Sequence, residues 1–319
     1  YEYHRDHSGV HFSSRLRPIL NMKPKTGTWA FNADTHITAW LHHLDQPFDV
    51  VTDEDLHLEG AEALAGYRVV ITGTHPEYYS TAMRDGLAVW LGAGGRLMYM
   101  GGNGFYWRIA YQPDNPAVIE VRRAEDGTRA WISNPGEYYQ QFNGEYGGLW
   151  RRLGRPPNEL VGIGFAAQGF DGGTHYRMQP GVLDPRVDFI IDGVEALDTW
   201  GSFGNQGGGA AGEEIDRWDD TLGSPRHAVI LASSEHHKPG MLRVKEEFHM
   251  IEPLGNDPKV RADMVFFEVP GGGAVFSTGS ISYAGSLAHN EYDNEIAKIT
   301  ANVLKRFIDA APFEYPQPV

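Results

Sequence analysis

The sequence predicts an α/β fold built on an open, mostly parallel sheet with helices on both faces. Three observations support this prediction. Residues 67–75 (YRVVITGTH) and 96–100 (RLMYM) are nearly continuous apolar runs, as expected of strands buried on both faces. Residues 78–95 between them place apolar side chains at helical spacing, which completes a β-α-β unit. No repeat or long linker divides the 319 residues, so we expect a single domain over 1–319.

The first hundred residues supply the elements of this unit. Residues 1–33 contain prolines and little periodicity, which predicts an irregular lead-in. A helix is expected from Asp34, its candidate N-cap, through Leu44, and a strand is expected over 48–56 (FDVVTDEDL). The helix between the two apolar runs has Ser80 as its candidate cap and ends at the glycines of 92–95.

The rest of the chain predicts a long insertion followed by more strands and a final helix. Residues 107–215 are rich in glycine and proline, and we expect this insertion of short strands and loops to cover the binding crevice. Short strands are predicted at 117–123, 187–191, 227–234, 241–248, 262–269 and 274–280. The turn at 270–273 predicts a hairpin between the last two strands. Residues 290–309 form an amphipathic helix pattern whose apolar residues repeat at helical spacing.

Composition excludes several classes of function. The formal net charge of −15 argues against nucleic acid as a partner, because phosphate contacts need a basic surface. No apolar run is long enough to span a bilayer. The absence of cysteine removes thiol nucleophiles, thiolate metal sites and disulfides, and it is consistent with a reducing cytoplasm. Because the chain opens YEYHRDHSGV without a start Met, we expect it to be part of a longer protein.

The stretch GRLMYMGGNGFYWR (95–108) has the pattern of the strand-to-helix elbow on which many α/β hydrolases display a nucleophile. The residue at its tip is Asn103, which cannot attack, and G-x-S-x-G does not occur in the chain. The Asn103 amide would either hold a substrate carbonyl or stabilise a tight turn. Binding sites of open α/β sheets lie beyond the carboxyl ends of the strands. We therefore expect the loops at 52–54, 73–79 and 101–106 to converge on one crevice.

Metal-binding residue types point to oxygen ligands. The 14 histidines include no H-E-x-x-H pattern, although His75, His237 and His289 lie at predicted strand or loop ends. Several of the 15 tyrosines lie in glycine-flanked loops, where each either packs as an aromatic or offers a phenolate to a hard ion such as Fe(III). In GGGAAGEEIDR (207–217), two adjacent acids follow a flexible segment of glycine and alanine. These acids are either ligands or the first turn of a helix.

Seven stretches together resemble the C-terminal domain of the large subunit of N,N-dimethylformamidase. They are SGVHFSSRLRPILNMKPK, DVVTDEDLH, THPEYYS, MYMGGNGFYW, GGGAAGEEIDR, ADMVFFEVPGGGAVFSTGSISYAGSL and HNEYDNEIAKITANVLKRF. The resemblance implies a class I glutamine-amidotransferase-like (flavodoxin-like) domain that has lost its Cys nucleophile. It also implies a mononuclear iron, expected as Fe(III), held by two tyrosines and one glutamate. The implied reaction is hydrolysis of a small formamide to formate and an amine, with metal-activated water in place of a covalent intermediate.

The resemblance also implies roles for single residues. It places the iron ligands at Tyr106, Tyr146 and Glu214, with Glu213 and Glu235 as alternative carboxylates. The family carries a His two residues before its Glu, where this chain has Gly212, and this departure leaves the carboxylate assignment open. The residues expected to orient the substrate or transfer protons are Asn103, Glu235, His237, His289 and Asn290.

The resemblance further implies partners, and two other functions stay open. The family enzyme has a small helical partner subunit and a large subunit that oligomerises and carries an N-terminal lectin-like β domain. A chain without its nucleophile could instead be a ligand- or carbohydrate-binding module with no turnover. A third hypothesis is a metal-independent hydrolase in which Glu235 and His237 act as acid and base.

Overall fold

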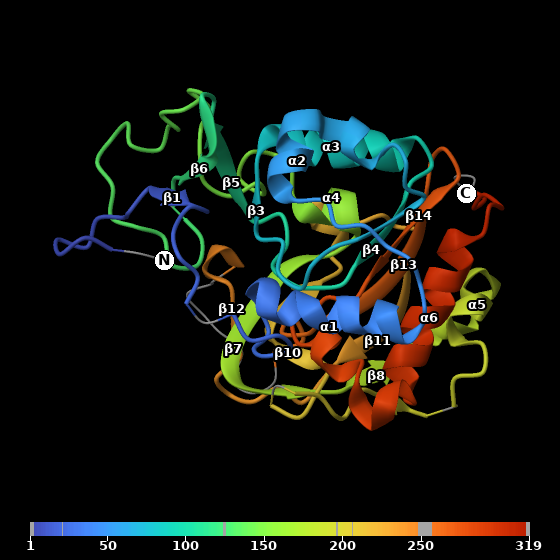
Figure 1. Ribbon diagram of the computed structural model, residues 1–319. Helices are drawn as coiled ribbons and strands as arrows, with labels where there is room; N and C mark the ends of the chain where they lie inside the picture. Colours follow the sequence, from blue (N-terminus) through green and yellow to red (C-terminus); the bar gives the residue numbers. More distant parts are fainter. Residues whose placement is uncertain are drawn as a thin grey trace.

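The computed structural model describes residues 3–20, 22–123, 126–195, 197–205, 207–247 and 257–316 (Figure 1). A seven-stranded sheet forms its centre, in the order β2-β4-β14-β13-β11-β8-β9. Its strands are β2 (Val69–Ile71), β4 (Arg96–Tyr99), β14 (Gly273–Ser277), β13 (Asp263–Val269), β11 (Val229–Ser234), β8 (Tyr176–Met178) and β9 (Thr199–Trp200). The helices are α1 (Ala30–His43), α2 (Asp53–Glu59), α3 (Thr81–Gly92), α4 (Pro157–Val161), α5 (Asp188–Ile191) and α6 (Glu295–Ile308).

Two smaller sheets flank the central one. The first has the order β1-β6-β5-β3, with β1 (Phe12–Ser14), β6 (Asn115–Val121), β5 (Trp107–Gln112) and β3 (Tyr78–Tyr79). Figure 1 shows this sheet to one side of the molecule, beside the N-terminal residues. The second has the order β10-β7-β12, with β10 (Ala211–Arg217), β7 (Gly164–Thr174) and β12 (Leu242–Arg243). Much of the predicted covering insertion is therefore regular structure, and β10 at its end lies next to the central sheet.

The predicted flavodoxin-like, mostly parallel sheet is wrong. In the central sheet, β4 runs parallel to β2 and to β14, but the remaining described pairs are antiparallel. The physical reason is the connections. One crossover helix, α3, joins β2 to β4, whereas β13 and β14 are joined by the tight glycine turn that the sequence predicts. A tight turn produces antiparallel pairing, and parallel pairing needs a long crossover. The fold is a mixed α/β arrangement with several antiparallel sheets.

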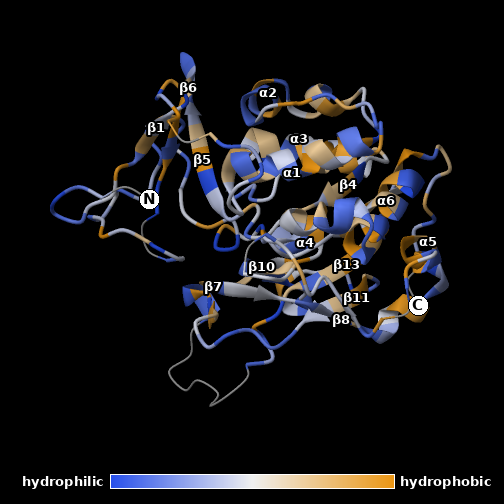
Figure 2. Cartoon of the chain, turned by 60° about the horizontal axis from the view of Figure 1, so that its bottom comes forward, coloured by the Kyte–Doolittle hydropathy of each residue, from blue (hydrophilic) through white to orange (hydrophobic). Residues whose placement is uncertain are grey.

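Helices nevertheless cover both faces of the central sheet. Met98 and Met100 point to one core, which they share with α1 and α6, while Leu97 and Tyr99 point to a second core with α2 and α3. This alternation is the two-residue period of a strand that is buried on both sides. The predicted amphipathic helix is confirmed as α6, and Figure 2 shows hydrophobic and hydrophilic residues along its turns. No helix among the described residues is both long and apolar enough to cross a membrane.

Several local predictions need correction. Residues 48–52 form no strand, and α2 begins at Asp53 behind the N-cap Thr52. Residues 187–191 form the short helix α5 with its preceding turn, because Pro185 begins a helical turn there. Helix α1 begins at Ala30, so Asp34 lies inside it and is no cap. The predicted strand over 241–248 is reduced to Leu242–Arg243, and residue 248 lies outside the described residues. The Ser80 cap of α3 is confirmed.

Candidate functional site

The elbow after β4 is a turn between two strands, and no helix follows it. Residues 101–106 lead directly into β5. The Gly102 N–H donates to the Thr74 carbonyl at 3.2 Å, which joins the elbow to the loop that follows β2. A Cβ at Gly101 would lie 2.0 Å from the backbone carbonyl oxygen of Thr74, and a Cβ at Gly102 would lie 2.5 Å from the backbone carbonyl oxygen of Glu214. These two glycines are needed because the elbow packs between the β2 loop and β10.

Strand β10 crosses the carboxyl ends of the parallel strands. The Asp216 N–H donates to the Gly279 carbonyl at 2.9 Å, just beyond β14, and the Ile281 N–H donates to the Glu214 carbonyl at 3.2 Å. Alternation along β10 places Glu214 and Asp216 on the same face, toward the elbow. The loops after β2 and β4 and the strand β10 therefore meet at the edge where α/β sheets bind ligands.

The tip of the elbow is held by a buried pair, Tyr99 and Asp216. The Asn103 backbone lies in the left-handed region, with φ 51°, and its N–H donates to Asp216 Oδ1 at 2.7 Å. The Tyr99 hydroxyl donates to Asp216 Oδ2 at 2.7 Å and accepts from the Gly104 N–H at 2.6 Å. Asn tolerates this backbone conformation better than most residues. The turn is thus fixed by side chains that come from β4 and β10.

His75, Glu214 and Asn103 meet above this turn. His75 Nε2 lies 2.7 Å from Glu214 Oε2 and 3.6 Å from Glu77 Oε2. Asn103 Nδ2 donates to Glu214 Oε2 at 3.1 Å and lies 3.3 Å from His75 Nε2. The Asn103 Oδ1 atom is buried and has no hydrogen-bond partner among the described residues. We call His75, Glu77, Asn103, Glu214 and Asp216 the elbow cluster.

The elbow cluster holds more acids than bases. Burial alone would lower the pKa of His75, but the carboxylates of Glu214 and Glu77 outweigh it and raise that pKa to about 9. Burial raises the pKa of Asp216 to about 7, against the hydrogen bonds from Asn103 and Tyr99. At neutral pH, one imidazolium therefore faces at least two carboxylates, and the cluster favours a further positive charge or a proton.

Glu213, the alternative to Glu214, points elsewhere. A register shift interrupts the pairing of β10 with β7 between Gly212 and Glu213, and Glu213 has a left-handed φ of 61°. The Thr28 hydroxyl donates to the Glu213 carboxylate, and burial raises the pKa of that group. The left-handed backbone at Glu213 accompanies its contact with Thr28, whereas Glu214 faces His75.

The two predicted tyrosine ligands have other neighbours. The Tyr106 hydroxyl donates to Glu246 Oε2 at 3.1 Å and accepts from the Thr128 N–H at 2.8 Å. Burial raises the pKa of Tyr106 above its ordinary value and raises that of Glu246 to about 7. Tyr146 is half-buried, and its ring packs edge-on against Tyr139 with the centroids 5.2 Å apart. The three predicted ligands are thus held by separate partners.

The remaining predicted site residues lie in other contacts. Glu235 pairs with Arg177 at 2.5 Å and His175 at 3.3 Å, and the Arg177 hydrogen bond lowers the pKa of Glu235 to about 2. His237 Nε2 lies 2.6 Å from the Ser234 hydroxyl, and burial lowers the pKa of His237 to about 4. His289 stacks on Phe203 with the centroids 3.9 Å apart. Asn290 donates from its side chain to the Asp293 carbonyl at 2.9 Å.

Sequence reasoning missed two members of this arrangement, Tyr99 and Asp216. Tyr99 lies in an apolar run, and the sequence therefore predicts only a core side chain there. Asp216 follows the paired acids, and its position on the Glu214 face shows only if 211–217 is read as a strand. The two-residue spacing of Glu214 and Asp216 is the signal that could have found it.

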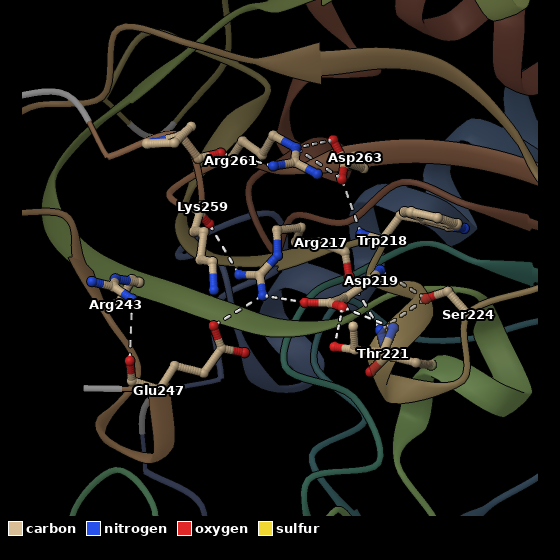
Figure 3. Close-up of polar contacts among 12 residues, drawn as sticks. Arg217, Trp218, Asp219, Thr221, Ser224, Arg243, Glu247, Lys259, Arg261 and Asp263 are labelled. Carbon is tan, nitrogen blue, oxygen red and sulfur yellow. Dashed lines mark hydrogen bonds and ion pairs between the residues drawn. The ribbon is translucent and has the colours of Figure 1, made fainter. Parts of the chain in front are cut away.

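A second polar network surrounds Arg217, the last residue of β10, whose side chain leaves the strand on the face opposite to Asp216 (Figure 3). The Arg217 guanidinium is buried and pairs with Asp219 at 2.7 Å and Glu247 at 2.9 Å. Glu247 also pairs with Arg151 at 2.8 Å. The Arg217 side chain further donates to the Lys259 carbonyl at 3.2 Å. We call Arg151, Arg217, Asp219 and Glu247 the arginine network. It joins β10 to the turn 245–247, which carries Glu246.

The described residues contain no group of three or more His, Asp or Glu side chains arranged to hold a metal ion. Glu214 and His75 are donors of the kind that hold iron, but they contact each other at hydrogen-bond distance. The predicted set of Tyr106, Tyr146 and Glu214 stays a prediction; in this structure the Tyr106 hydroxyl contacts Glu246 and Glu214 contacts His75.

Comparison with known proteins adds a family likeness to this geometry. Residues 1–294 match the family described as N,N-dimethylformamidase beta subunit-like, C-terminal. The chain is similar to the N,N-dimethylformamidase beta subunits of an Alcaligenes species and of Paracoccus aminophilus, with 40% identity to each over 320 residues. Each alignment covers 98% of this chain and 42% of the relative. The chain therefore spans about two fifths of the length of these relatives.

Proposed function

This chain belongs to the N,N-dimethylformamidase beta subunit-like, C-terminal family, and we propose that it is the hydrolytic part of an amidohydrolase. The proposed reaction cleaves the C–N bond of small N-substituted formamides, such as N,N-dimethylformamide, to formate and an amine. The names of the two relatives support the substrate class. The observation that carries the proposal is the elbow cluster at the carboxyl ends of the parallel strands.

The elbow cluster offers the groups that amide hydrolysis needs. Water must lose a proton as its oxygen bonds to the carbonyl carbon, and the leaving nitrogen must gain a proton as the C–N bond breaks. Glu214 is a carboxylate suited to accept the first proton, and the His75 imidazolium beside it is suited to supply the second. Asn103 holds Glu214 in place through its Nδ2 hydrogen bond, which leaves its Oδ1 atom for a donor on the substrate or on water.

Iron dependence is part of this proposal on the strength of the resemblance alone. When bound, a metal supplies carbonyl polarisation and a lowered water pKa. In the structure the Tyr106 hydroxyl contacts Glu246 and Glu214 contacts His75, so we derive no step through iron. Elemental analysis of the purified full-length protein tests this part separately. About one iron per chain supports iron dependence, and full activity without bound metal contradicts it.

Assembly and location are also proposed. The relatives are named as beta subunits, so we propose that the full-length protein assembles with a second subunit. A small helical partner, a large subunit that associates with copies of itself and a cytoplasmic location complete the proposal. Size-exclusion chromatography with light scattering on the co-expressed protein measures the stoichiometry.

Formate release tests the activity. The full-length protein is incubated with N,N-dimethylformamide, and formate and dimethylamine are quantified together. Equimolar release of the two products supports the proposal. Absence of turnover by a folded, fully assembled protein contradicts it and favours the ligand- or carbohydrate-binding module, which binding measurements with small amides and oligosaccharides would then identify.

A further inference from the structure

We propose that a cavity between the C-terminal end of α1 and the N-terminal end of α6 binds a small organic cation. The cavity has a volume of about 420 Å³, within the range of small-molecule sites. Its walls come from α1, from the turn before α6 and from the loop after α5. Figure 1 shows α1 and α6 side by side, and residues of both share one core.

This cavity is separate from the elbow cluster. Asp34, near the start of α1, accepts the Thr74 N–H at 2.8 Å, beside the elbow cluster. Trp40, which lines the cavity, lies six residues further along the same helix. At about 1.5 Å per residue, that separation is roughly 9 Å along the axis. A ligand in the cavity therefore need not contact the elbow cluster.

Aromatic side chains form one wall of the cavity. The rings of His43 and Tyr292 are stacked, with their centroids 4.3 Å apart and an interplanar angle of 20°. Trp40 is only 1% exposed, and its indole N–H has no acceptor among the described residues. A buried indole N–H usually finds a partner. A ligand oxygen in the cavity would supply it.

Charge on the cavity lining selects a cation. Three carboxylates, those of Glu195, Asp293 and Glu295, line it against a single ammonium, that of Lys298. Glu295 already accepts the Gly201 N–H at 2.9 Å. Within the described part of the chain, Asp293 and Glu195 have no ion-pair partner. Two carboxylates beside aromatic rings form a typical environment for an ammonium group.

The backbone that carries the wall is strained. Asn290, Glu291 and Tyr292 are consecutive non-glycine residues in the left-handed region, with φ of 48°, 54° and 69°. Such a conformation costs free energy at each residue and persists where the surroundings determine it. Here it brings Tyr292 against His43 and places Asp293 at the start of α6. The combination of charge, rings and an unpartnered N–H points to an alkylammonium that carries a hydroxyl or carbonyl oxygen.

A pair of isosteric probes tests this proposal without reference to formamide turnover. Choline carries the cation and a hydroxyl, and 3,3-dimethylbutan-1-ol has the same shape without the charge. We expect calorimetric titration of the full-length protein to show choline binding at least about tenfold tighter than the neutral alcohol. Tetramethylammonium, which lacks the oxygen, should bind more weakly than choline. Equal binding of choline and the alcohol, or no binding of either, would overturn the proposal.

Variants locate the binding. Asp293→Asn should weaken choline binding roughly three- to fivefold, as expected for a partly exposed ion pair, and Lys298→Gln should strengthen it. Trp40→Phe should reduce the preference for choline over tetramethylammonium, and its melting temperature reports whether it folds. Glu62→Gln is the matched control, because Glu62 is an exposed acid outside the cavity. Equal loss in Asp293→Asn and Glu62→Gln would show that only the overall charge matters, which contradicts a site.

Discussion

The two faces of strand β10 carry buried polar networks of opposite character. On one face, Glu214 and Asp216 join Glu77 in the elbow cluster around a single base, His75. On the other face, Arg217 belongs to the arginine network, which pairs two guanidinium groups with two carboxylates. The arginine network is balanced in charge. The elbow cluster has an excess of acid, and its buried Asn103 amide oxygen has no partner within the part of the chain that the structure describes.

This difference separates a structural network from a candidate site. A buried polar group costs free energy unless it is paired, so a network that serves stability alone should be satisfied. The arginine network meets that condition. The elbow cluster does not, and its excess of acids is tolerated because the pKa of Asp216 rises and His75 holds its proton. An unsatisfied cluster at the carboxyl edge of parallel strands is what a binding site requires before its ligand arrives.

The largest effect is expected from Glu214→Gln. The substitution keeps the shape of the side chain but removes the charge that faces His75, so the proton acceptor is lost. We expect formate release to fall about 10²- to 10⁴-fold, and the melting temperature to fall as well, because His75 loses the main carboxylate that holds its proton. Steady-state assays and thermal unfolding of the same preparation measure both.

Glu213→Gln is the matched comparison for this variant. It removes the same charge one residue away, where the carboxylate contacts Thr28. Its loss of activity should be at least about tenfold smaller. Equal losses would show that the different contacts of Glu213 and Glu214 do not matter for activity, and this would contradict the assignment of the elbow cluster as the active site.

The next largest effect tests the arginine network. Arg217→Met leaves Glu247 and Asp219 without their shared partner in a buried position, and we expect a loss of about 3–5 kcal/mol in the free energy of unfolding. Urea denaturation measures it. The control is Arg226→Met, because Arg226 is exposed and lies 3.5 Å from Asp220, so its loss should stay below about 1 kcal/mol. A large loss of activity without a loss of stability in Arg217→Met would reverse our assignment.

The sequence predicts the helices of this fold better than the direction of its strands. Apolar spacing located α3 and α6, and the Ser80 cap located the start of α3. Apolar runs located β4, β11, β13 and β14. A run that is buried on both faces looks the same in parallel and antiparallel pairing, so the apolar pattern did not reveal that β11 runs antiparallel to β13 and to β8. Only the turn at 270–273 predicted an antiparallel pair, that of β13 with β14. The relative direction of two strands depends on which strands become neighbours, and this is decided by contacts between residues far apart in the sequence.

The candidate site was only partly predictable for a similar reason. The loops that follow neighbouring parallel strands meet at one edge of the sheet, so the sequence predicted that the β2 loop and the elbow lie together. The Gly102–Thr74 hydrogen bond confirms this. The contact between His75 and Glu214 joins residues far apart in the chain, and it depends on how β10 crosses the sheet. The glycines before Glu213 suggested a flexible segment that leads to the paired acids. In the structure they instead allow β10 and the residues before it to pack closely on β7.

A pH-dependent effect of intermediate size should distinguish the elbow cluster from the arginine network. His75 has a pKa of about 9 in the folded protein, because the neighbouring carboxylates outweigh burial, and an ordinary value near 6.5 when unfolded. The folded protein therefore binds this proton more tightly. Its contribution to stability is complete below about pH 6.5 and is lost as the pH rises through about 9.

His75→Gln removes this contribution. Between pH 6.5 and 9, the free energy of unfolding of the natural protein should fall by roughly 1–3 kcal/mol more than that of the variant. Urea denaturation at several pH values measures the difference. Arg217→Met should leave the difference intact, because guanidinium groups keep their proton throughout this range. Parallel pH profiles of the natural protein and His75→Gln would contradict the ion pair at the elbow cluster.

The smallest effect comes from the other partner of Arg217. Asp219→Asn removes one carboxylate of the arginine network, but Arg217 keeps Glu247, and the Asn oxygen can still accept the Thr221 N–H that Asp219 accepts at 3.0 Å. No buried charge is left unpaired, so we expect a loss of only about 1 kcal/mol in the free energy of unfolding. Urea denaturation of both variants, Asp219→Asn and Arg217→Met, gives the ratio of the free energies of unfolding that they lose. A loss in Asp219→Asn as large as that in Arg217→Met would mean that stability follows the number of ion pairs. A much smaller loss shows that it follows the balance of buried charge, the property that separates the arginine network from the elbow cluster.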